Sequence, residues 1–330
     1  MHMKHISILI THQALIAAIG NVKHMFSVVN EFLAESGGDP MFNVELVGLS
    51  SQMSLGNSSF IIQTDAIIQE LDRTDLIIIP PVSDDVLSSV EQNKPYIPWI
   101  RQQYKQGAEV ASLCVGAFLL AETGLLDGKY CSTHWNTVND FKVRYPKVRL
   151  VDHKILTDEK GIYTSGGANS YWNLLVYLAG KLTHYEIAVR TSKYFEVDLD
   201  RDNQGVYSTF EGCRFHSDEP IQKVQNYLER HYHELPSLNS LADMAGYGVR
   251  TFQRRFKNAT HYTVINYLQK LRVEAAKQML VQGVLTVNEI MYDVGYSDSD
   301  AFRKVFKKET GLTPSGYRKK FVKHGTYDIS

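Results

Sequence analysis

The chain has 330 residues, 44% of them hydrophobic and 22% charged, and its 35 Lys and Arg nearly balance its 36 Asp and Glu. This composition is typical of a globular protein and excludes a disordered or fibrous chain, and the length exceeds what one hydrophobic core usually holds, so we expect at least two domains. From Asp218 onward, 17 Lys and Arg face 12 Asp and Glu, a net charge of +5, whereas the preceding residues carry −6. The basic C-terminal third favours contact with nucleic acid, although an ordinary solvated surface would give the same imbalance.

The three cysteines include no C-x-x-C pair, which argues against a disulfide framework and against a cysteine-based zinc site. The first apolar run covers only residues 6–10, too short for a signal peptide or a membrane span. We therefore expect a cytoplasmic protein that contacts no membrane and needs no cofactor or metal.

Short apolar runs recur through the first half of the chain, at residues 6–10, 44–49, 76–80 and 109–113. Continuous apolar runs are typical of strands that are buried on both faces of a parallel sheet. Segments with the periodicity of an α-helix separate these runs. Further along the chain we expect a hairpin at 155–164 that turns at Gly161, followed by two helices at 171–182 and 185–195. The alternation predicts a doubly wound α/β domain over residues 1–200.

Cys114 follows the predicted strand at 109–113 and precedes a helix expected at 117–122. Ligands bind at the carboxyl ends of parallel strands, and the N-terminus of a helix lowers the pKa of a thiol and attracts anions. The position therefore suits either a reactive thiolate or a small side chain that lines a pocket.

The stretch ASLCVGAFLLAETGLLDGK, with Ser132-Thr133-His134-Trp135 and Thr164-Ser165-Gly166-Gly167 further on, resembles the amidotransferase-like (PfpI-type) sensor domain of GlxA-type transcription regulators. The resemblance implies an amidotransferase-like, flavodoxin-like fold, a homodimer, and a small-molecule effector such as an amine or an amino-acid derivative. The implied pocket residues are Cys114, Val115, His134, Trp135, Gly166 and Gly167.

Catalysis by Cys114 would require a base or a cation beside the thiol. Catalytic relatives place a His directly after the Cys, or a Glu in the loop after the first strand, whereas here Val115 follows and residues 11–21 contain no carboxylate. His134 is the remaining candidate base. We predict a pocket residue and no catalytic site; the alternative is a bifunctional protein with a Cys-dependent amidase or hydratase-like activity fused to a DNA-binding domain.

Residues 201–219, rich in Asp, Asn, Gly and Ser, are the predicted linker, and residues 220–322 form a predicted all-α domain with an internal repeat. Gly246 and Tyr247 recur 49 positions later, and Phe252 and Phe256 recur 50 positions later. Each copy predicts a short helix, a turn and a second helix that can enter the major groove of DNA. The two helix-turn-helix motifs are expected at about 238–259 and 287–309, with a linker helix at about 262–281.

The second copy, from Gly295 to Arg318, closely resembles the DNA-binding domain of the AraC family, whereas the first departs from it at 258–263, where the usual connector contains Gly. The resemblance implies double-stranded operator DNA as a partner and, for an activator, RNA polymerase. A structural nucleoid or adaptor protein would not need two complete motifs. Helix periodicity and the resemblance together predict DNA contacts by Arg250, Thr251, Gln253, Arg254, Lys257, Ser299, Asp300, Arg303, Lys304 and Lys307.

Overall fold

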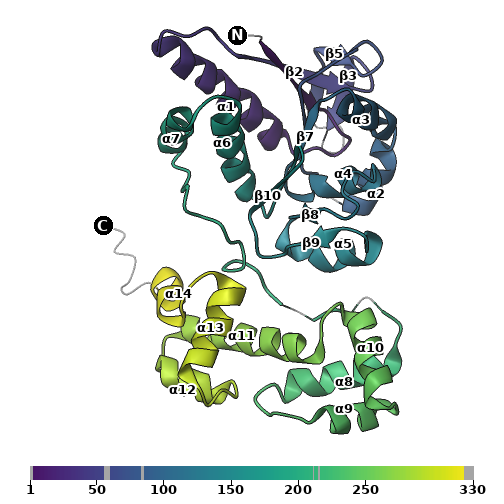
Figure 1. Cartoon of the computed structure of the whole chain (residues 1–330), viewed down its shortest axis with the longest axis vertical. Coiled ribbons are helices and arrows are strands. Elements are labelled where there is room, and N and C mark those ends of the chain that lie inside the picture. Colours follow the sequence, from purple (N-terminus) through teal and green to yellow (C-terminus); the bar gives the residue numbers. More distant parts are fainter. Residues whose placement is uncertain (1–2, 56–59, 83–84, 211, 215, 323–330) are drawn as a thin grey trace. The chain divides into compact units, whose positions relative to one another are not determined.

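The computed structural model describes residues 3–55, 60–82, 85–210, 212–214 and 216–322. The chain divides into two compact units, Met1–Gln204 and Gly205–Ser330, which we call unit 1 and unit 2 (Figure 1). The division falls inside the predicted linker, so its first four residues belong to unit 1.

Unit 1 is built on a seven-stranded sheet in the order β10-β11-β7-β6-β1-β2-β5. All neighbours pair in parallel except β10 and β11, which form an antiparallel hairpin at one edge. Both turn residues of this hairpin, Lys160 and Gly161, have positive φ angles of 55° and 76°, as a two-residue turn of this kind requires. The strands are β1 (Lys4–Leu9), β2 (Phe42–Gly48), β5 (Ala66–Ile67), β6 (Leu76–Ile79), β7 (Glu109–Ser112), β10 (Leu156–Glu159) and β11 (Ile162–Ser165).

Helices cover both faces of this sheet, so the predicted doubly wound α/β fold is confirmed (Figure 1). One face packs against α1 (Ile16–Glu35), α6 (Ser170–Leu182) and α7 (Tyr185–Tyr194). The opposite face packs against α2 (Val86–Asn93), α3 (Tyr96–Lys105), α4 (Ala117–Glu122) and α5 (Val138–Arg144).

Strand β6 explains why the predicted strands are apolar throughout. Its residues Leu76 and Ile78 belong to the core on the α1 side, whereas Ile77 and Ile79 belong to the core on the α4 side. Alternate side chains of a strand point to opposite faces, so a strand covered on both faces needs apolar residues at every position.

Several small elements of unit 1 were not predicted from the sequence. They are the hairpin β3–β4 (Gln52–Leu55 and Phe60–Gln63), the short pair β8–β9 (Tyr130–Cys131 and Arg149–Leu150), and helices α2 and α5. Two single 3-10 turns, Cys114–Gly116 and Trp135–Thr137, precede α4 and α5.

Unit 2 is helical in all of its described elements, which confirms the predicted all-α fold. One core joins α8, α9 and α10 to the first half of α11, and a second core joins the second half of α11 to α12, α13 and α14. The helices are α8 (Glu219–Arg230), α9 (Leu238–Ala245), α10 (Val249–Thr260), α11 (Val264–Gln282), α12 (Val287–Asp293), α13 (Ser299–Thr310) and α14 (Pro314–Phe321).

Residues 205–210, which we call the connecting segment, pack on unit 2 rather than forming a solvated linker. Val206 is buried in the second core and Phe210 packs against the first. Lys277 of α11 donates a hydrogen bond to the carbonyl of Ser208, and the backbone N–H of Phe210 donates to Glu274 at 3.2 Å. Both hydrogen bonds use backbone atoms of the segment, so its amino-acid composition does not reveal them.

The residue before the connecting segment, Gln204, is anchored equally firmly in unit 1. Its side chain is buried, and its Nε2 donates to the carbonyls of Thr133 and Asp152, both at 2.9 Å. Its Oε1 accepts a hydrogen bond from the backbone N–H of Gly167. Residues 204–210 of the predicted linker therefore pack on one unit or the other, and α8 begins at Glu219, the last residue of the predicted range.

Candidate functional site

Helices α10 and α13 are the second helices of two helix-turn-helix motifs. Each follows a short helix, and a glycine with positive φ lies in the turn between the two: Gly246, with a φ of 72°, caps α9, and Gly295, with a φ of 86°, lies two residues after the end of α12. A Cβ atom on Gly295 would lie 2.2 Å from the carbonyl oxygen of His233, so no other residue fits there without backbone movement.

The two motifs have the same interior. Phe252 and Phe256 of α10, and Phe302 and Phe306 of α13, are all buried. The rings of Phe256 and Tyr267 pack edge to face with centroids 5.4 Å apart, and Phe306 and Tyr317 repeat this contact at 5.6 Å. The repeat seen in the sequence is thus a repeat of packing.

The connector that lacks glycine in the first motif adopts the same bend as the second. His261 takes a φ of 61° where Gly311 takes 78°. Thr263 and Thr313 then begin the next helices, each accepting a hydrogen bond from the backbone N–H three residues later, at 3.2 and 3.1 Å. The departure from the usual connector therefore leaves the bend unchanged.

The residues predicted to contact DNA lie on the outer faces of α10 and α13. Nine of the ten are exposed and Ser299 is half-buried. Within the part of the chain that the structure describes, none of the six Arg and Lys side chains among them forms an ion pair: Arg250, Arg254, Lys257, Arg303, Lys304 and Lys307.

Some other cations of unit 2 have protein partners. Arg255, next to Arg254 in sequence, pairs with Asp218 at 2.9 Å and lies over the ring of Tyr247. Lys270 of α11 pairs with Glu309 at 2.7 Å. The cations on the outer faces have no such partner among the described residues and are therefore available to phosphates and base edges.

Arg272 of α11 links the two motifs, a role that the sequence did not reveal. Its guanidinium donates hydrogen bonds to the carbonyls of Tyr232 (2.7 Å), Glu234 (2.9 Å) and Gly295 (2.9 Å). The first two carbonyls precede α9 and the third lies in the turn before α13. The only available signal was one arginine within the apolar stripe of the predicted linker helix.

Cys114 occupies a strained elbow between β7 and α4. Its φ is 55°, its backbone N–H donates to Ser165 Oγ at 3.0 Å, and its carbonyl accepts from Thr133 Oγ1 at 3.2 Å. Burial raises the pKa of the thiol to about 12, so the depressed value that a helix N-terminus could give is not found. Among the described residues, the sulfur makes no hydrogen bond with His134.

Two of the other predicted pocket residues, Gly166 and Gly167, lie against the side chain of Gln204, and Gly167 also lies beside Trp135 and His134. A Cβ on Gly166 would lie 2.6 Å from Gln204 Oε1, and one on Gly167 would lie 3.3 Å from Trp135 and 3.5 Å from His134. Burial lowers the pKa of His134, whose Nδ1 accepts a hydrogen bond from the backbone of Asn136. The residues are brought together as a packed group.

A small cavity lies beside Val115 and Gly116. The cavity lined by Val115, Gly116 and Leu119 measures about 10 Å³, enough for about one water molecule. No group of three or more His, Cys, Asp or Glu side chains in the described residues could hold a metal ion.

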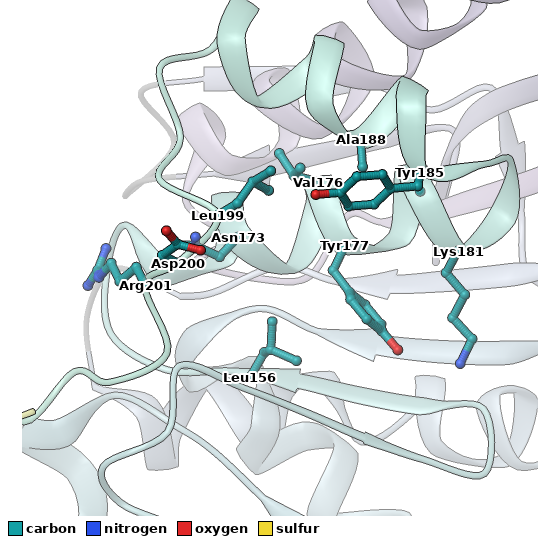
Figure 2. A pocket seen from close by; sticks show the side chains of 11 residues that line it. Leu156, Asn173, Val176, Tyr177, Lys181, Tyr185, Ala188, Leu199, Asp200 and Arg201 are labelled. Atoms are coloured by element: carbon teal, nitrogen blue, oxygen red, sulfur yellow. The ribbon is translucent and has the colours of Figure 1, made fainter.

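A much larger cavity lies between α6, α7, β10 and the residues that follow α7 (Figure 2). It measures about 550 Å³, and we call it the α6–α7 groove. Its residues come from four separate segments, and the sequence marked α6 only as an apolar helix, so it was not predicted. The lining residues are Leu156, Asn173, Val176, Tyr177, Gly180, Lys181, Tyr185, Ala188, Leu199, Asp200 and Arg201.

Comparison with known proteins identifies both units. Residues 26–179 match the DJ-1/PfpI family, and residues 241–320 match a helix-turn-helix domain family. A ThiJ/PfpI family protein of known structure from Pseudomonas syringae has a similar fold, with a TM-score of 0.50 and 14% identity over 75% of this chain and 92% of its own. None of the described helices is long and apolar enough to cross a membrane.

Two curated regulators match across both units. The transcriptional regulator GbdR of Pseudomonas aeruginosa is 24% identical over 226 residues, 68% of this chain. This match spans 61% of GbdR's own length. The transcriptional regulator GlxA of Rhizobium meliloti is 23% identical over 226 residues, which are 67% of this chain and 68% of GlxA. The predicted resemblance to GlxA-type regulators is confirmed.

Proposed function

We propose that this chain, which joins a DJ-1/PfpI domain to an AraC-type helix-turn-helix domain, is a transcription regulator that binds specific DNA sequences. The observation that carries the proposal is the duplicated motif, which has the same interior twice and, as far as the described residues show, basic side chains without an ion pair on both outer faces. A helical bundle without a nucleic-acid partner would need neither the duplication nor a basic outer face on each second helix.

Each of α10 and α13 enters a major groove with its outer face. Gln253 and Arg254 suit contacts to adenine and guanine, while Lys257 and Lys307, nearer the helix ends, suit phosphates. Lys304 stands where Arg254 stands in the first motif, and an ammonium lacks the two-pronged geometry that a guanidinium offers to guanine.

The helix between the motifs supports simultaneous binding. α11 has 19 residues, which gives about 28 Å of helix. Successive major grooves on one face of DNA are about 34 Å apart. With Arg272 fixing both motifs to α11, one chain reads two adjacent groove segments.

Unit 1 supplies regulation in this proposal. It binds a small-molecule effector, an amine or an amino-acid derivative, and pairs with a second copy to form a homodimer. A protein of this kind acts in the cytoplasm on operator DNA, and as an activator it would also contact RNA polymerase. The elbow residues Cys114, Val115, His134, Trp135, Gly166 and Gly167 form the part of unit 1 that corresponds to the active-site region of catalytic relatives.

A Cys-dependent enzyme is the weaker candidate. A nucleophilic thiol needs a pKa near or below the working pH and a base within hydrogen-bond reach. Burial moves the pKa of Cys114 in the opposite direction, and the thiol makes no hydrogen bond with His134 in the described structure. Turnover of any substrate that is lost in both Cys114→Ser and His134→Ala would overturn this judgement.

The test of DNA recognition is Arg254→Ala on the full chain, after a preferred sequence has been selected from random DNA. If Arg254 reads a base, the variant should bind the selected sequence more weakly by roughly 1–3 kcal/mol and relax preference at one position. The matched control is Arg230→Ala, which removes an equally exposed arginine from the end of α8.

Two outcomes would count against the proposal. Selection that returns no preferred sequence would refute sequence-specific binding outright. An Arg254→Ala variant that loses the same affinity for selected and scrambled DNA would show that Arg254 contacts only phosphate.

A further inference from the structure

We propose that Asp300 of α13 reads a cytosine in the major groove of one DNA segment, whereas Arg250, at the equivalent position of α10, reads a guanine in the other. The inference rests on the proposed function, because it assigns base preferences to two residues of the same DNA-binding faces. It goes beyond that proposal in one respect. The two motifs require different DNA segments, so the chain binds its site in one orientation.

The two helices can be compared position by position, because each has 12 residues and the repeat has an offset of 50. The offset aligns the buried residues, which are Phe252, Phe256 and Thr260 in α10 and Phe302, Phe306 and Thr310 in α13. At the other nine positions, too, the two aligned residues have the same degree of exposure. Residues 50 positions apart therefore occupy the same place on the two outer faces.

The second position of each helix carries opposite charges in the two motifs. Arg250 of α10 aligns with Asp300 of α13, and both side chains are exposed. Two later positions of the outer faces keep their positive charge, since the aligned pairs there are Arg254 with Lys304 and Lys257 with Lys307. A cation and an anion accept different partners, so the two motifs cannot make the same contact at the second position.

A structural role is the alternative explanation for Asp300, because an acid in the first turn of a helix stabilises that helix. The cap of α13 is supplied by Asp298, whose Oδ1 accepts hydrogen bonds from the backbone N–H groups of Asp300 and Ala301, both at 2.8 Å. Helix α10 has the same length although it has no acid in its first turn and no side-chain cap. A second helix of this motif therefore forms without an acid at this position.

The carboxylate of Asp300 is not paired with a cation, as far as the described residues show. Arg303 and Lys304 stand three and four residues later, which is the spacing of ion pairs on a helix, but neither forms an ion pair with Asp300. Phosphates repel an exposed carboxylate. Asp300 therefore fits a DNA complex only where it meets a group that donates a hydrogen bond.

The place of Asp300 in α13 indicates which donor this is. The first residues of the second helix of a helix-turn-helix motif contact base edges, and Asp300 is the second residue of α13. Only cytosine and adenine present a hydrogen-bond donor in the major groove. Adenine has the acceptor N7 beside its N6 donor, and this acceptor repels a carboxylate, whereas cytosine presents its N4 donor alone. The carboxylate therefore selects cytosine.

The same reasoning gives a different base for Arg250. A guanidinium donates two parallel hydrogen bonds, and guanine presents the two acceptors O6 and N7. Cytosine would place its N4 donor against the guanidinium, so Arg250 rejects the base that Asp300 selects. A site made of two identical segments would therefore suit one motif and oppose the other.

The experiment is selection of preferred sequences from random double-stranded DNA by the full chain, followed by affinity measurements on the selected sequence and on a scrambled one. The unmodified chain should select two segments that differ from each other. Asp300→Asn should lose the preference for cytosine at one position and gain a preference for adenine there, because a carboxamide both accepts from N6 and donates to N7. Its affinity for the originally selected sequence should fall about tenfold.

Binding to scrambled DNA separates base recognition from a structural role. Removal of an acid from the DNA-facing surface should raise the affinity of Asp300→Asn for scrambled DNA by about twofold or more, whereas a destabilised helix would lower the affinity for both sequences. Asp300→Glu keeps the carboxylate and should keep the preference for cytosine. The matched control is Asp202→Asn, which neutralises an exposed acid of unit 1 and should bind both sequences as the unmodified chain does.

The reciprocal variant, Arg250→Asp, should replace a guanine by a cytosine in the other segment. The proposal is overturned if Asp300→Asn still selects cytosine, if it loses the same affinity for selected and scrambled DNA, or if Arg250→Asp still selects guanine. The two levels of the proposal fail differently. An unmodified chain that selects no sequence would refute the regulator itself, whereas a selected sequence that does not respond to Asp300→Asn would refute only this inference.

Discussion

Replacing Arg272 with alanine should destabilise unit 2 and leave unit 1 unchanged. The guanidinium is largely buried and satisfies three backbone carbonyls, at 2.7, 2.9 and 2.9 Å, that belong to both motifs. Hydrogen bonds to a charged group contribute about 1.5–3 kcal/mol each, but the freed carbonyls regain some water and the cost of burying the charge is removed. We expect a net loss of about 3–4 kcal/mol in the free energy of unfolding, a large part of the stability of a small domain.

The chain provides separate probes for its two units. All three tryptophans, Trp99, Trp135 and Trp172, lie in unit 1, so tryptophan fluorescence during urea unfolding follows that unit alone. Far-ultraviolet circular dichroism also follows the helices of unit 2. Arg272→Ala should move the dichroism transition to lower urea and leave the fluorescence transition in place.

Two further variants calibrate the size of this effect. Arg272→Lys keeps the charge but cannot reach three carbonyls, so its loss should be intermediate. Arg250→Ala, an exposed arginine of α10, should change stability by less than about 0.5 kcal/mol. A loss below about 1 kcal/mol in Arg272→Ala, or an equal shift of both transitions, would refute the role assigned to Arg272.

Three other outcomes are expected. Gly246→Ala should lower the free energy of unfolding of unit 2 by about 1–2 kcal/mol, which is the strain of an alanine in the left-handed conformation. Gly295→Ala should lower it clearly more, because the Cβ of an alanine at 295 would also clash with the backbone of His233, whereas one at 246 meets no atom. Equal losses in the two variants would contradict the turn geometry. Burial raises the pKa of both Cys114 and Cys131 to about 12, against about 8.5 in an unfolded chain, so the folded state keeps protons that the unfolded state releases. The free energy of unfolding of unit 1, measured by fluorescence, should therefore fall as pH rises above about 8.5, by up to about 1.4 kcal/mol per pH unit for each thiol. Cys114→Ser should make this fall shallower. A free energy of unfolding that did not change with pH would show that the thiols ionise without unfolding. Lys307→Ala should weaken binding to selected and scrambled DNA by the same factor and reduce the salt slope by about 0.9, and a loss confined to selected DNA would mean that Lys307 reads a base.

Elements whose residues all face a core could be predicted from the sequence. The strands predicted at 6–10, 44–49, 76–80 and 109–113 begin and end within two residues of β1, β2, β6 and β7, because a short, continuous apolar run between polar turns is typical of a buried strand. The second helices of both motifs were found because Phe at i and i+4 recurs with the repeat. The start of helix α1 at Ile16 was not predicted, since Leu15 makes no side-chain cap and nothing in the sequence marks that start.

Features that depend on contacts between distant residues could not be predicted. Lys277 meets the carbonyl of Ser208 across 69 positions, and Gln204 meets Thr133 across 71. Local composition makes residues 201–219 resemble a flexible linker, because it does not show which partners will satisfy the polar groups. The α6–α7 groove is of the same kind, since an empty space is defined by how four segments pack. The DNA contacts and the pocket at the elbow stay predictions.

The packing of the connecting segment sets where this architecture can be cut and rejoined. Val206 and Phe210 each bury an apolar side chain in one of the two helical cores, and Lys277 and Glu274 are satisfied by the backbone between them. A helical fragment that began at residue 220 would expose those apolar surfaces and would leave the buried Lys277 without the carbonyl of Ser208 as an acceptor. Recombination that exchanges sensor domains among such regulators should therefore preserve the DNA-binding domain only if the crossover lies before Gly205. The connecting segment is then inherited together with the helices on which it packs.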